Sequence, residues 1–389
     1  MLEDNLPSER RGLRPLPIVL VAIVLFAAGW VTVKFDLLGH LRSEESVSFN
    51  KLSGISNDAP STEGIEGLRK AAERGDPAAQ NRLGDSYDEG RGVSQDHAQA
   101  VGWYRQAAEQ NFALAENNLG YAYEHGVGVA QDWSQAIEWY RKAATQDLPP
   151  AENNLGYAYE HGQGVPRDYE QAVQWYRKAA QHDNAAAENS LGHACEYGNG
   201  IPQDYSQAVE WYRKAAAQNF ASAENNLGYA YQHGQGVPQD YAQAVQWYRK
   251  AANQHFAPAQ TNLGFACERG LGLPRDEAQA VSWFRLAANK GLAPAQTALG
   301  HDYENGDGVP QNYAEAVKWY RKAAAQNNPQ AENALGSAYY LGHGVPKDMQ
   351  QAVKLLEKSA ADGDADAQEN LKTVRRQRRV TAKKPKRAA

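Results

Sequence analysis

The chain has few of the residues that build cross-linked or metal-stabilised folds. It contains only two cysteines, Cys195 and Cys267, among 389 residues, which excludes a disulfide scaffold and a zinc site with four thiolates. It also lacks an excess of positive charge, because 46 Asp and Glu outnumber 40 Lys and Arg. The resulting net charge of -6 excludes a uniformly basic nucleic-acid-binding protein.

Positive charge is concentrated at the carboxy terminus. Residues 372–389 hold nine Lys and Arg and no acidic residue, which leaves residues 51–371 acidic. We expect residues 375–389 to form a basic, disordered tail. This tail is either merely solvated or binds anionic lipid, another polyanion or nucleic acid, and the acidic balance of the chain makes nucleic acid the least favoured. A further alternative is that the tail folds back on acidic groups of the same chain.

One long apolar run stands out at residues 16–33, which read LPIVLVAIVLFAAGWVTV without a charge. A helix of that length spans about 27 Å, enough to cross the hydrocarbon core of a bilayer. We expect an uncleaved transmembrane anchor, because Trp30 and Lys34 suit a membrane interface. The alternative is a signal peptide cleaved near Ala28, which would release a soluble secreted or periplasmic protein.

An anchored chain implies a simple topology. Residues 1–15 would form a short cytoplasmic tail, and residues 34–62, rich in polar and small residues, would form a flexible linker. Long domains translocate largely regardless of their own charge, so the rest of the chain is expected outside the cytoplasm. The sequence therefore predicts a single-pass protein of the plasma or inner membrane with a periplasmic domain.

Glycine, by contrast, is abundant and regularly placed. A Leu-Gly pair recurs at a constant spacing of 36 residues, and a fixed period of this size predicts a solenoid of stacked repeats. The eight pairs are Leu83-Gly84, Leu119-Gly120, Leu155-Gly156, Leu191-Gly192, Leu227-Gly228, Leu263-Gly264, Leu299-Gly300 and Leu335-Gly336.

Each unit is expected to hold two helices joined by a glycine turn. Around Leu119, apolar residues at i, i+4, i+7 and i+8 form one helical stripe. Gly126 and Gly128 should end this first helix, and Asp132 is placed to cap the second. Gly120, inside a helix, predicts that another helix passes close by. One pair cannot bury its stripes alone, so neighbouring pairs must stack.

The repeat resembles a known family. Residues 223–252, AENNLGYAYQHGQGVPQDYAQAVQWYRKAA, carry its pattern most fully and are similar to the Sel1-like repeats, relatives of the tetratricopeptide repeat. Eight units over residues 76–363 match, with a half-repeat cap at 63–75 and a capping helix at 364–374. The resemblance implies an all-α, right-handed α-solenoid whose first helices line a concave groove. It also implies an adaptor or scaffold that binds a protein or peptide partner.

Helical geometry suggests which residues of the first helices contact that partner. With Leu119 at 0° and about 100° per residue, three positions of the unit point away from the buried stripe. Asn can bond a peptide backbone, aromatic rings give contact area at low entropic cost, and acids favour a basic segment. The alternative is a solvated face, repeated through recent duplication. The predicted partner-binding residues are Asn117, Tyr121, Glu124, Asn153, Tyr157, Glu160, Asn189, His193, Glu196, Asn225, Tyr229, Phe265 and Glu268.

The repeat register argues against catalysis. His125, His161 and His233 occupy the same position of different units, so they should be spread along the stack and not gathered around one metal or substrate. We therefore expect no enzymatic activity, no cofactor and no metal site. Cys195 and Cys267 lie two units apart, too far for a disulfide.

Overall fold

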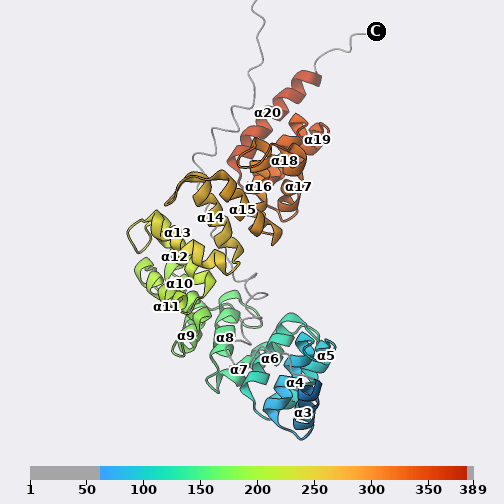
Figure 1. Cartoon of the computed structure of the whole chain (residues 1–389), viewed down its shortest axis with the longest axis vertical. Coiled ribbons are helices and arrows are strands. Elements are labelled where there is room, and N and C mark those ends of the chain that lie inside the picture. Colours follow the sequence, from blue (N-terminus) through green and yellow to red (C-terminus); the bar gives the residue numbers. More distant parts are fainter. Residues whose placement is uncertain (1–61, 383–389) are drawn as a thin grey trace, which may run out of the picture. The chain divides into compact units, whose positions relative to one another are not determined.

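The computed structural model describes residues 62–382, and every regular element in that range is an α-helix (Figure 1). The described residues form two compact units, residues 62–295 with 307–310, and residues 296–306 with 311–382. No helix between residues 62 and 382 combines the length and apolarity needed to cross a membrane. The transmembrane anchor predicted at 16–33 lies outside the described residues.

The helices alternate along the chain as the repeat predicts. Even-numbered helices from α4 to α18 are the first helices of the pairs, odd-numbered helices from α5 to α19 are the second helices, and α3 and α20 stand alone at the ends. The bounds are α3 Thr62–Glu73, α4 Pro77–Glu89, α5 His97–Ala108, α6 Ala113–His125, α7 Trp133–Ala144, α8 Pro149–His161, α9 Tyr169–Ala180, α10 Ala185–Tyr197, α11 Tyr205–Ala217, α12 Ala221–His233, α13 Tyr241–Asn253, α14 Ala257–Arg269, α15 Glu277–Asn289, α16 Ala293–Asn305, α17 Tyr313–Ala324, α18 Pro329–Leu341, α19 Met349–Ala361 and α20 Ala365–Ala382.

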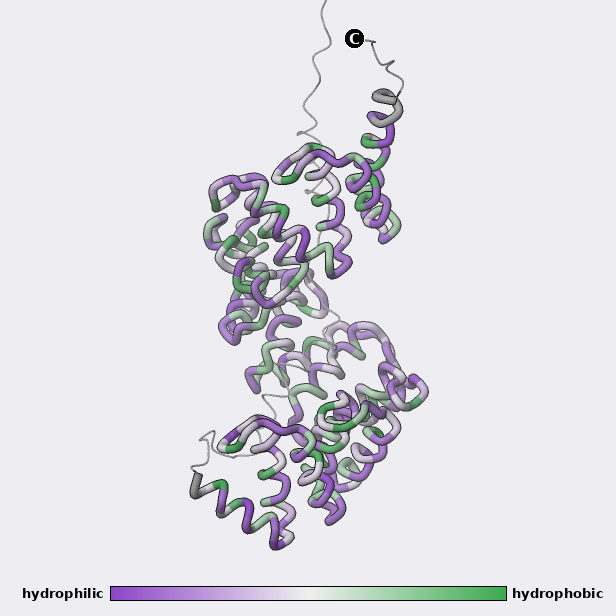
Figure 2. The backbone as a smooth tube through the Cα atoms, turned by 90° about the vertical axis from the view of Figure 1, so that its right-hand side faces the viewer, coloured by the Kyte–Doolittle hydropathy of each residue, from purple (hydrophilic) through white to green (hydrophobic). Residues whose placement is uncertain are grey.

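Glycine turns and capping residues end the helices as expected. Gly126 adopts φ 68° and closes α6 by donating its backbone N–H to the carbonyl of Ala122. The Asp132 carboxylate accepts the backbone N–H groups of Ser134 and Gln135 and so caps α7. Hydrophobic residues occur along every helix pair and are not gathered in one segment of the chain (Figure 2).

The second glycine of the turn allows neighbouring helix pairs to come into close contact. A Cβ on Gly128, which has φ 70°, would lie 2.1 Å from the carbonyl oxygen of His97 at the start of α5. A Cβ on Gly164 would lie 2.6 Å from the equivalent oxygen of Trp133. The glycine turn of one helix pair therefore contacts the backbone at the start of the second helix of the preceding pair. A side chain at the second glycine would push this turn away from that helix.

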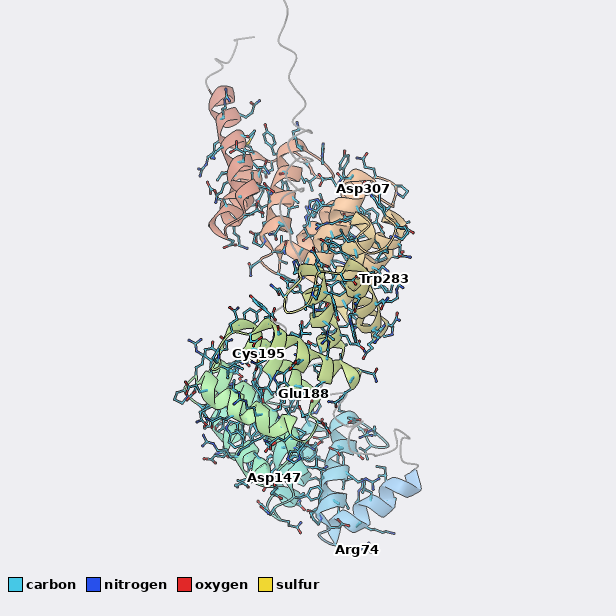
Figure 3. All side chains as sticks on the ribbon, turned by 90° about the vertical axis from the view of Figure 1, so that its left-hand side faces the viewer. Arg74, Asp147, Glu188, Cys195, Trp283 and Asp307 are labelled. Atoms are coloured by element: carbon cyan, nitrogen blue, oxygen red, sulfur yellow. The ribbon has the colours of Figure 1, made fainter. Side chains whose placement is uncertain are left out.

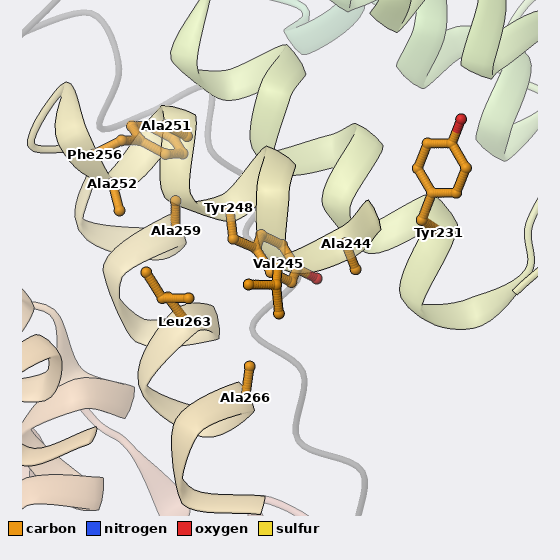
Figure 4. Packing of buried hydrophobic residues seen from close by; sticks show 10 residues of the cluster. All are labelled: Tyr231, Ala244, Val245, Tyr248, Ala251, Ala252, Phe256, Ala259, Leu263 and Ala266. Carbon is orange, nitrogen blue, oxygen red and sulfur yellow. The ribbon is translucent and has the colours of Figure 1, made fainter. Parts of the chain in front are cut away.

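The core is a series of clusters shared between pairs. One cluster joins Tyr231 of α12 and Tyr248 of α13 to Leu263 of α14, with Tyr248 fully buried (Figure 4). Trp247 packs against this cluster and also against the one before it, so it joins neighbouring helix pairs. The Lys250 ammonium lies 4.0 Å from the centre of the Trp247 ring and covers its outer side.

The last helix is longer than the sequence suggested. α20 runs from Ala365 to Ala382, past the boundary expected at 374. The prediction of a disordered tail from 375 is therefore wrong for residues 375–382, and residues 383–389 lie outside the described part. The helix continues because Arg and Gln have good helix propensity and no Pro or Gly interrupts the run before Pro385.

The glycine inside each first helix from α4 to α16 faces a buried ring, whereas Gly336 of α18 faces Leu356. A Cβ on Gly228 would lie 2.6 Å from two ring carbons of Tyr248. We expect Gly228→Ala to lower the free energy of unfolding by about 1–2 kcal/mol, because overpacking outweighs the gain in helix propensity. Urea unfolding followed by circular dichroism measures the change.

Gly102 provides the matched control. It lies in α5 with no atom within 4 Å of a Cβ built on it, so Gly102→Ala should raise stability by about 0.5–1 kcal/mol. Equal unfolding midpoints for the two variants would contradict the packing described here.

Candidate functional site

The predicted partner-binding residues lie only partly at the surface. In the unit formed by residues 62–295 and 307–310, Asn117 is 4% exposed and Glu124 is 2% exposed. Asn189, Glu196 and Asn225 are also buried. The expectation that these positions face solvent is wrong, whereas Tyr121, His193, Tyr229, Phe265 and Glu268 are half-exposed. Tyr157 is 8% exposed, and Asn153 and Glu160 are intermediate.

The acidic residues are held by tyrosines of their own pair. The hydroxyl of Tyr140 on α7 donates to the Glu124 carboxylate on α6 at 2.6 Å. Glu160 and Glu196 accept from Tyr176 and Tyr212 in the same way. Because these carboxylates satisfy buried hydroxyls, they are not an acidic surface for a basic partner. In the pair formed by α14 and α15, Phe284 has no hydroxyl, and Glu268 instead lies 3.8 Å from the Arg269 guanidinium.

The asparagines form a ladder between first helices. The Asn154 amide of α8 donates to the Asn117 side-chain oxygen of α6 at 3.1 Å. The same bond joins other neighbouring first helices, from Asn118 to Asn81, Asn226 to Asn189 and Asn262 to Asn225, and, in the other unit, from Asn370 to Asn333. The Asn that accepts in each rung, such as Asn117, is therefore a structural residue.

The ladder lacks a rung between α8 and α10. Ser190 stands where the other rungs have the donating Asn, and the side-chain oxygen of Asn153 is buried with no hydrogen-bond partner. The neighbouring Glu152 is also exceptional. Its equivalents Glu116, Glu188 and Glu224 accept from glutamines, whereas His182 stands at the glutamine position of this pair.

A second set of buried acids lines the contact within each pair. Glu188 of α10, labelled in Figure 3, is 3% exposed and accepts from the Gln218 amide at 2.8 Å. Burial raises the pKa of Glu188, while the Gln218 hydrogen bond and the charge of Lys214 oppose that rise. Glu116 and Glu224 repeat the arrangement, and burial raises their pKa values as well.

Rings occupy the surface at the carboxyl end of the first helices. Tyr121 stacks on His125 with ring centres 4.0 Å apart, and Tyr157 stacks on His161 at the same distance. The remaining pairs occupy the same place in the next units. They are His193 with Tyr197, Tyr229 with His233, and Phe265 with the Arg269 guanidinium at 5.3 Å. We call these five i, i+4 pairs the ring track.

The ring track includes residues that sequence reasoning left out. His125 and His161 are exposed, and Tyr197 is 52% exposed, the most exposed large hydrophobic side chain that the structure describes. At about 100° per residue around the helix axis, the exposed side of α6 is centred near 230° from Leu119. The sequence predicted a binding side about 60° away from this direction. The difference arises because the second helix of the pair covers the side of α6 that carries Glu124. The recurrence of histidine at one position was the sequence signal for this surface.

The cysteines are free. Cys195 lies on α10 (Figure 3) and Cys267 on α14, and both are buried thiols without a disulfide. Burial raises the pKa of Cys267 to about 11, so its thiol stays protonated and unreactive at neutral pH. Within residues 62–382 no group of three or more His, Cys, Asp or Glu is placed to hold a metal ion.

Comparison with known proteins accounts for the repeat. The Sel1 repeat model matches eight consecutive segments, residues 77–112, 113–148, 149–184, 185–220, 221–256, 257–292, 293–328 and 329–364. The chain belongs to the Sel1 repeat family. This confirms the resemblance drawn from residues 223–252, and the helix pairs described above are Sel1 repeats.

Solved structures share both sequence and fold. The protective antigen c5321, present in uropathogenic Escherichia coli strains and displaying an SLR fold, is 40% identical with a TM-score of 0.61, over 80% of this chain and 67% of that chain. A Sel1 repeat protein from Oxalobacter formigenes is 35% identical with a TM-score of 0.56, over 80% of this chain and 90% of that chain. The APC/C hetero-tetramer Cut9-Hcn1 is similar in fold alone, at 14% identity and a TM-score of 0.50, over 86% of this chain and 59% of that chain. No curated protein matches the chain.

The broken rung of the Asn ladder can be repaired. We expect Ser190→Asn to donate a hydrogen bond to Asn153 and to raise the free energy of unfolding by about 0.5–1.5 kcal/mol. The reciprocal control, Asn226→Ser, removes the bond to Asn189 and should lower stability by a similar amount. Urea midpoints that move in the same direction for both variants would contradict the role of the ladder.

Asp85 predicts a pH dependence. Its carboxylate is 6% exposed and accepts from Tyr104, Asn81 and Asn118. Burial raises the pKa of Asp85 to about 6, although the Tyr104 hydrogen bond opposes the rise. The folded state then binds more protons than the unfolded state between about pH 4 and pH 6, so this contribution to stability falls as pH rises.

The matching measurement compares wild type with Asp85→Asn. Between about pH 5 and pH 7, wild type should lose about 1 kcal/mol of unfolding free energy relative to the variant. Urea unfolding at the two pH values gives the difference. A wild-type stability that rises relative to Asp85→Asn over this range would show that the carboxyl is not protonated in the folded state.

Proposed function

We propose that this Sel1 repeat protein is a non-catalytic scaffold that binds an extended segment of a protein partner along the ring track. The observation that carries the proposal is an i, i+4 pair that recurs in five consecutive repeats between residues 113 and 292, four times as two rings and once as Phe265 with Arg269. Rings have few rotatable bonds, so they provide contact area at small entropic cost. A merely solvated face gives no reason for rings at the same position of five repeats.

The spacing of the ring track fits an extended peptide. Neighbouring helix layers lie about 10 Å apart, and an extended chain advances about 3.3 Å per residue, so successive ring pairs would meet about every third residue of the partner. The half-exposed Asn118 and Asn226 donate their amide hydrogens to the ladder. Their side-chain oxygens are oriented by those bonds and would accept N–H groups from the partner backbone.

The absence of catalysis is part of the proposal. A reacting site needs an acid, a base or a nucleophile gathered around one point. Here buried carboxylates of the first helices accept hydrogen bonds from their own pair, as Glu124 does from Tyr140 and Glu188 does from Gln218, and the histidines are spread over several repeats. This distribution supports binding of one long partner across many repeats.

We further propose that residues 16–33 tether the scaffold to the plasma or inner membrane, with the repeats in the periplasm. Support comes from the apolar run itself and from its flanking Trp30 and Lys34. Full-length protein in a washed membrane fraction is the expected result. A shorter soluble form with a new amino terminus near Ala28 would favour cleavage and release.

Site-specific photocrosslinking in the native host tests the ring track. Probes at Tyr229 and Tyr197 on the ring track should capture the same protein, whereas a probe at Gln246, exposed on the second helix α13, should not. Equal capture at Gln246 would contradict the proposal, because that residue belongs to the opposite helix of the pair.

Binding of the captured partner then tests the rings directly. The double variant Tyr121→Ala with Tyr229→Ala should weaken affinity at least about tenfold, since truncating ring contacts commonly costs more than about 1 kcal/mol each. The control, Gln174→Ala with Gln246→Ala on the second helices, should bind like wild type. Unchanged affinity of the ring variant, with unfolding midpoints also unchanged, would remove the ring track as the site.

A further inference from the structure

The final helix has a packing face and a free face. Ala367, Leu371 and Val374 of α20 are buried in a cluster with Val353 and Leu356 of α19. This apolar stripe does not continue, because the next position of the stripe after Val374 is Arg378. Beyond Val374, therefore, α20 is a helix without further apolar residues on its packing side.

Basic residues gather on the opposite face of α20. With Val374 at 0° and about 100° per residue, Lys372, Arg375, Arg376 and Arg379 fall within an arc from about 100° to 200°. We call these four residues the basic face. Lys372, Arg375 and Arg376 are exposed, and Arg375 also bonds Glu357 of α19 at 2.7 Å. No acidic residue follows Glu369 in the sequence, and four more Lys or Arg lie between 383 and 389.

We propose that the basic face of α20 docks on an anionic phospholipid surface. A helix face about 11 Å long, with cations on both of its turns and no apolar side chain among them, fits a plane of phosphate groups that it touches without inserting. Clusters of four to eight Lys and Arg on a helix are the sequence feature associated with anionic lipid. This surface is separate from the ring track and does not rest on the proposed scaffold function.

Two other occupants fit less well. Residues 365–389 contain no aromatic residue, so the segment has no platform on which the bases of a single strand could stack. Folding back on the chain's own acids is also disfavoured, because Glu124, Glu160 and Glu196 already accept tyrosine hydroxyls. A flat anionic surface needs only the phosphate contacts that the basic face can provide.

Vesicle sedimentation of the full chain tests the proposal. Wild type should bind vesicles of equal parts phosphatidylglycerol and phosphatidylcholine more strongly than pure phosphatidylcholine vesicles, and the preference should shrink in high salt. The comparison cancels any attachment through residues 16–33 that is indifferent to lipid charge. The triple variant Lys372→Gln, Arg376→Gln, Arg379→Gln, which keeps Arg375 and its bond to Glu357, should lose the preference by about 100-fold.

A matched control separates the basic face from net charge. The variant Lys70→Gln, Arg74→Gln, Arg82→Gln changes the charge equally at exposed residues of α3, α4 and the turn between them and should keep the preference. Replacing Arg376 and Arg379 by Lys should also keep it, because the interaction needs charge and not a guanidinium.

Other outcomes overturn the proposal. An unchanged preference in the triple variant, or an equal loss in the control, would remove the basic face as a lipid-binding surface. Binding of duplex DNA through the same three residues, without any preference for phosphatidylglycerol vesicles, would assign the face to nucleic acid. The urea unfolding midpoint of the triple variant should equal that of wild type. This control shows that a loss of the lipid preference does not come from unfolding.

Discussion

The close contact between a helix glycine and a tyrosine ring determines how each pair is built. A Cβ on Gly156 would lie 2.5 Å from the ring of Tyr176, so the ring occupies the space that any larger residue would need. The ring is buried, and its hydroxyl must therefore find an acceptor, which Glu160 supplies at 2.6 Å. Glycine, tyrosine and an acceptor four residues after the glycine thus form one requirement, which recurs in the pairs that contain Tyr140, Tyr176, Tyr212, Tyr248 and Tyr320.

One pair that departs from this requirement shows how the three positions depend on one another. Phe284 replaces the tyrosine against Gly264, and Glu268 is released to the half-exposed surface beside Arg269. Phe265, where other repeats have tyrosine or histidine, packs edge-on against Phe284 with ring centres 4.9 Å apart. Losing one hydroxyl has therefore changed the surface as well as the core. Repeats with the same backbone can present different chemistry to a partner.

The sequence was sufficient to predict the helix pairs and their ends but not the surface. The 36-residue period, the φ > 0 glycines and Asp132 each act locally, so their roles follow from spacing alone. The buried state of Asn117 and Glu124 depends instead on which neighbouring helix covers which side, and a single helical wheel holds no information about that direction. Only the contact of Tyr140 with Glu124 locates the covering helix and moves the exposed arc toward His125.

The bonds of the Asn ladder have a consequence for how such a chain can change length. Within residues 62–295, each rung joins residues 37 positions apart, one repeat plus one residue, and each turn glycine rests on the unit just before it. The two residues that form a rung are fixed by their spacing within the repeat and not by their distance from either end of the stack. A whole repeat can therefore be gained or lost with the contacts between the remaining repeats re-formed, so the length of the stack can change while the way in which each repeat packs stays the same.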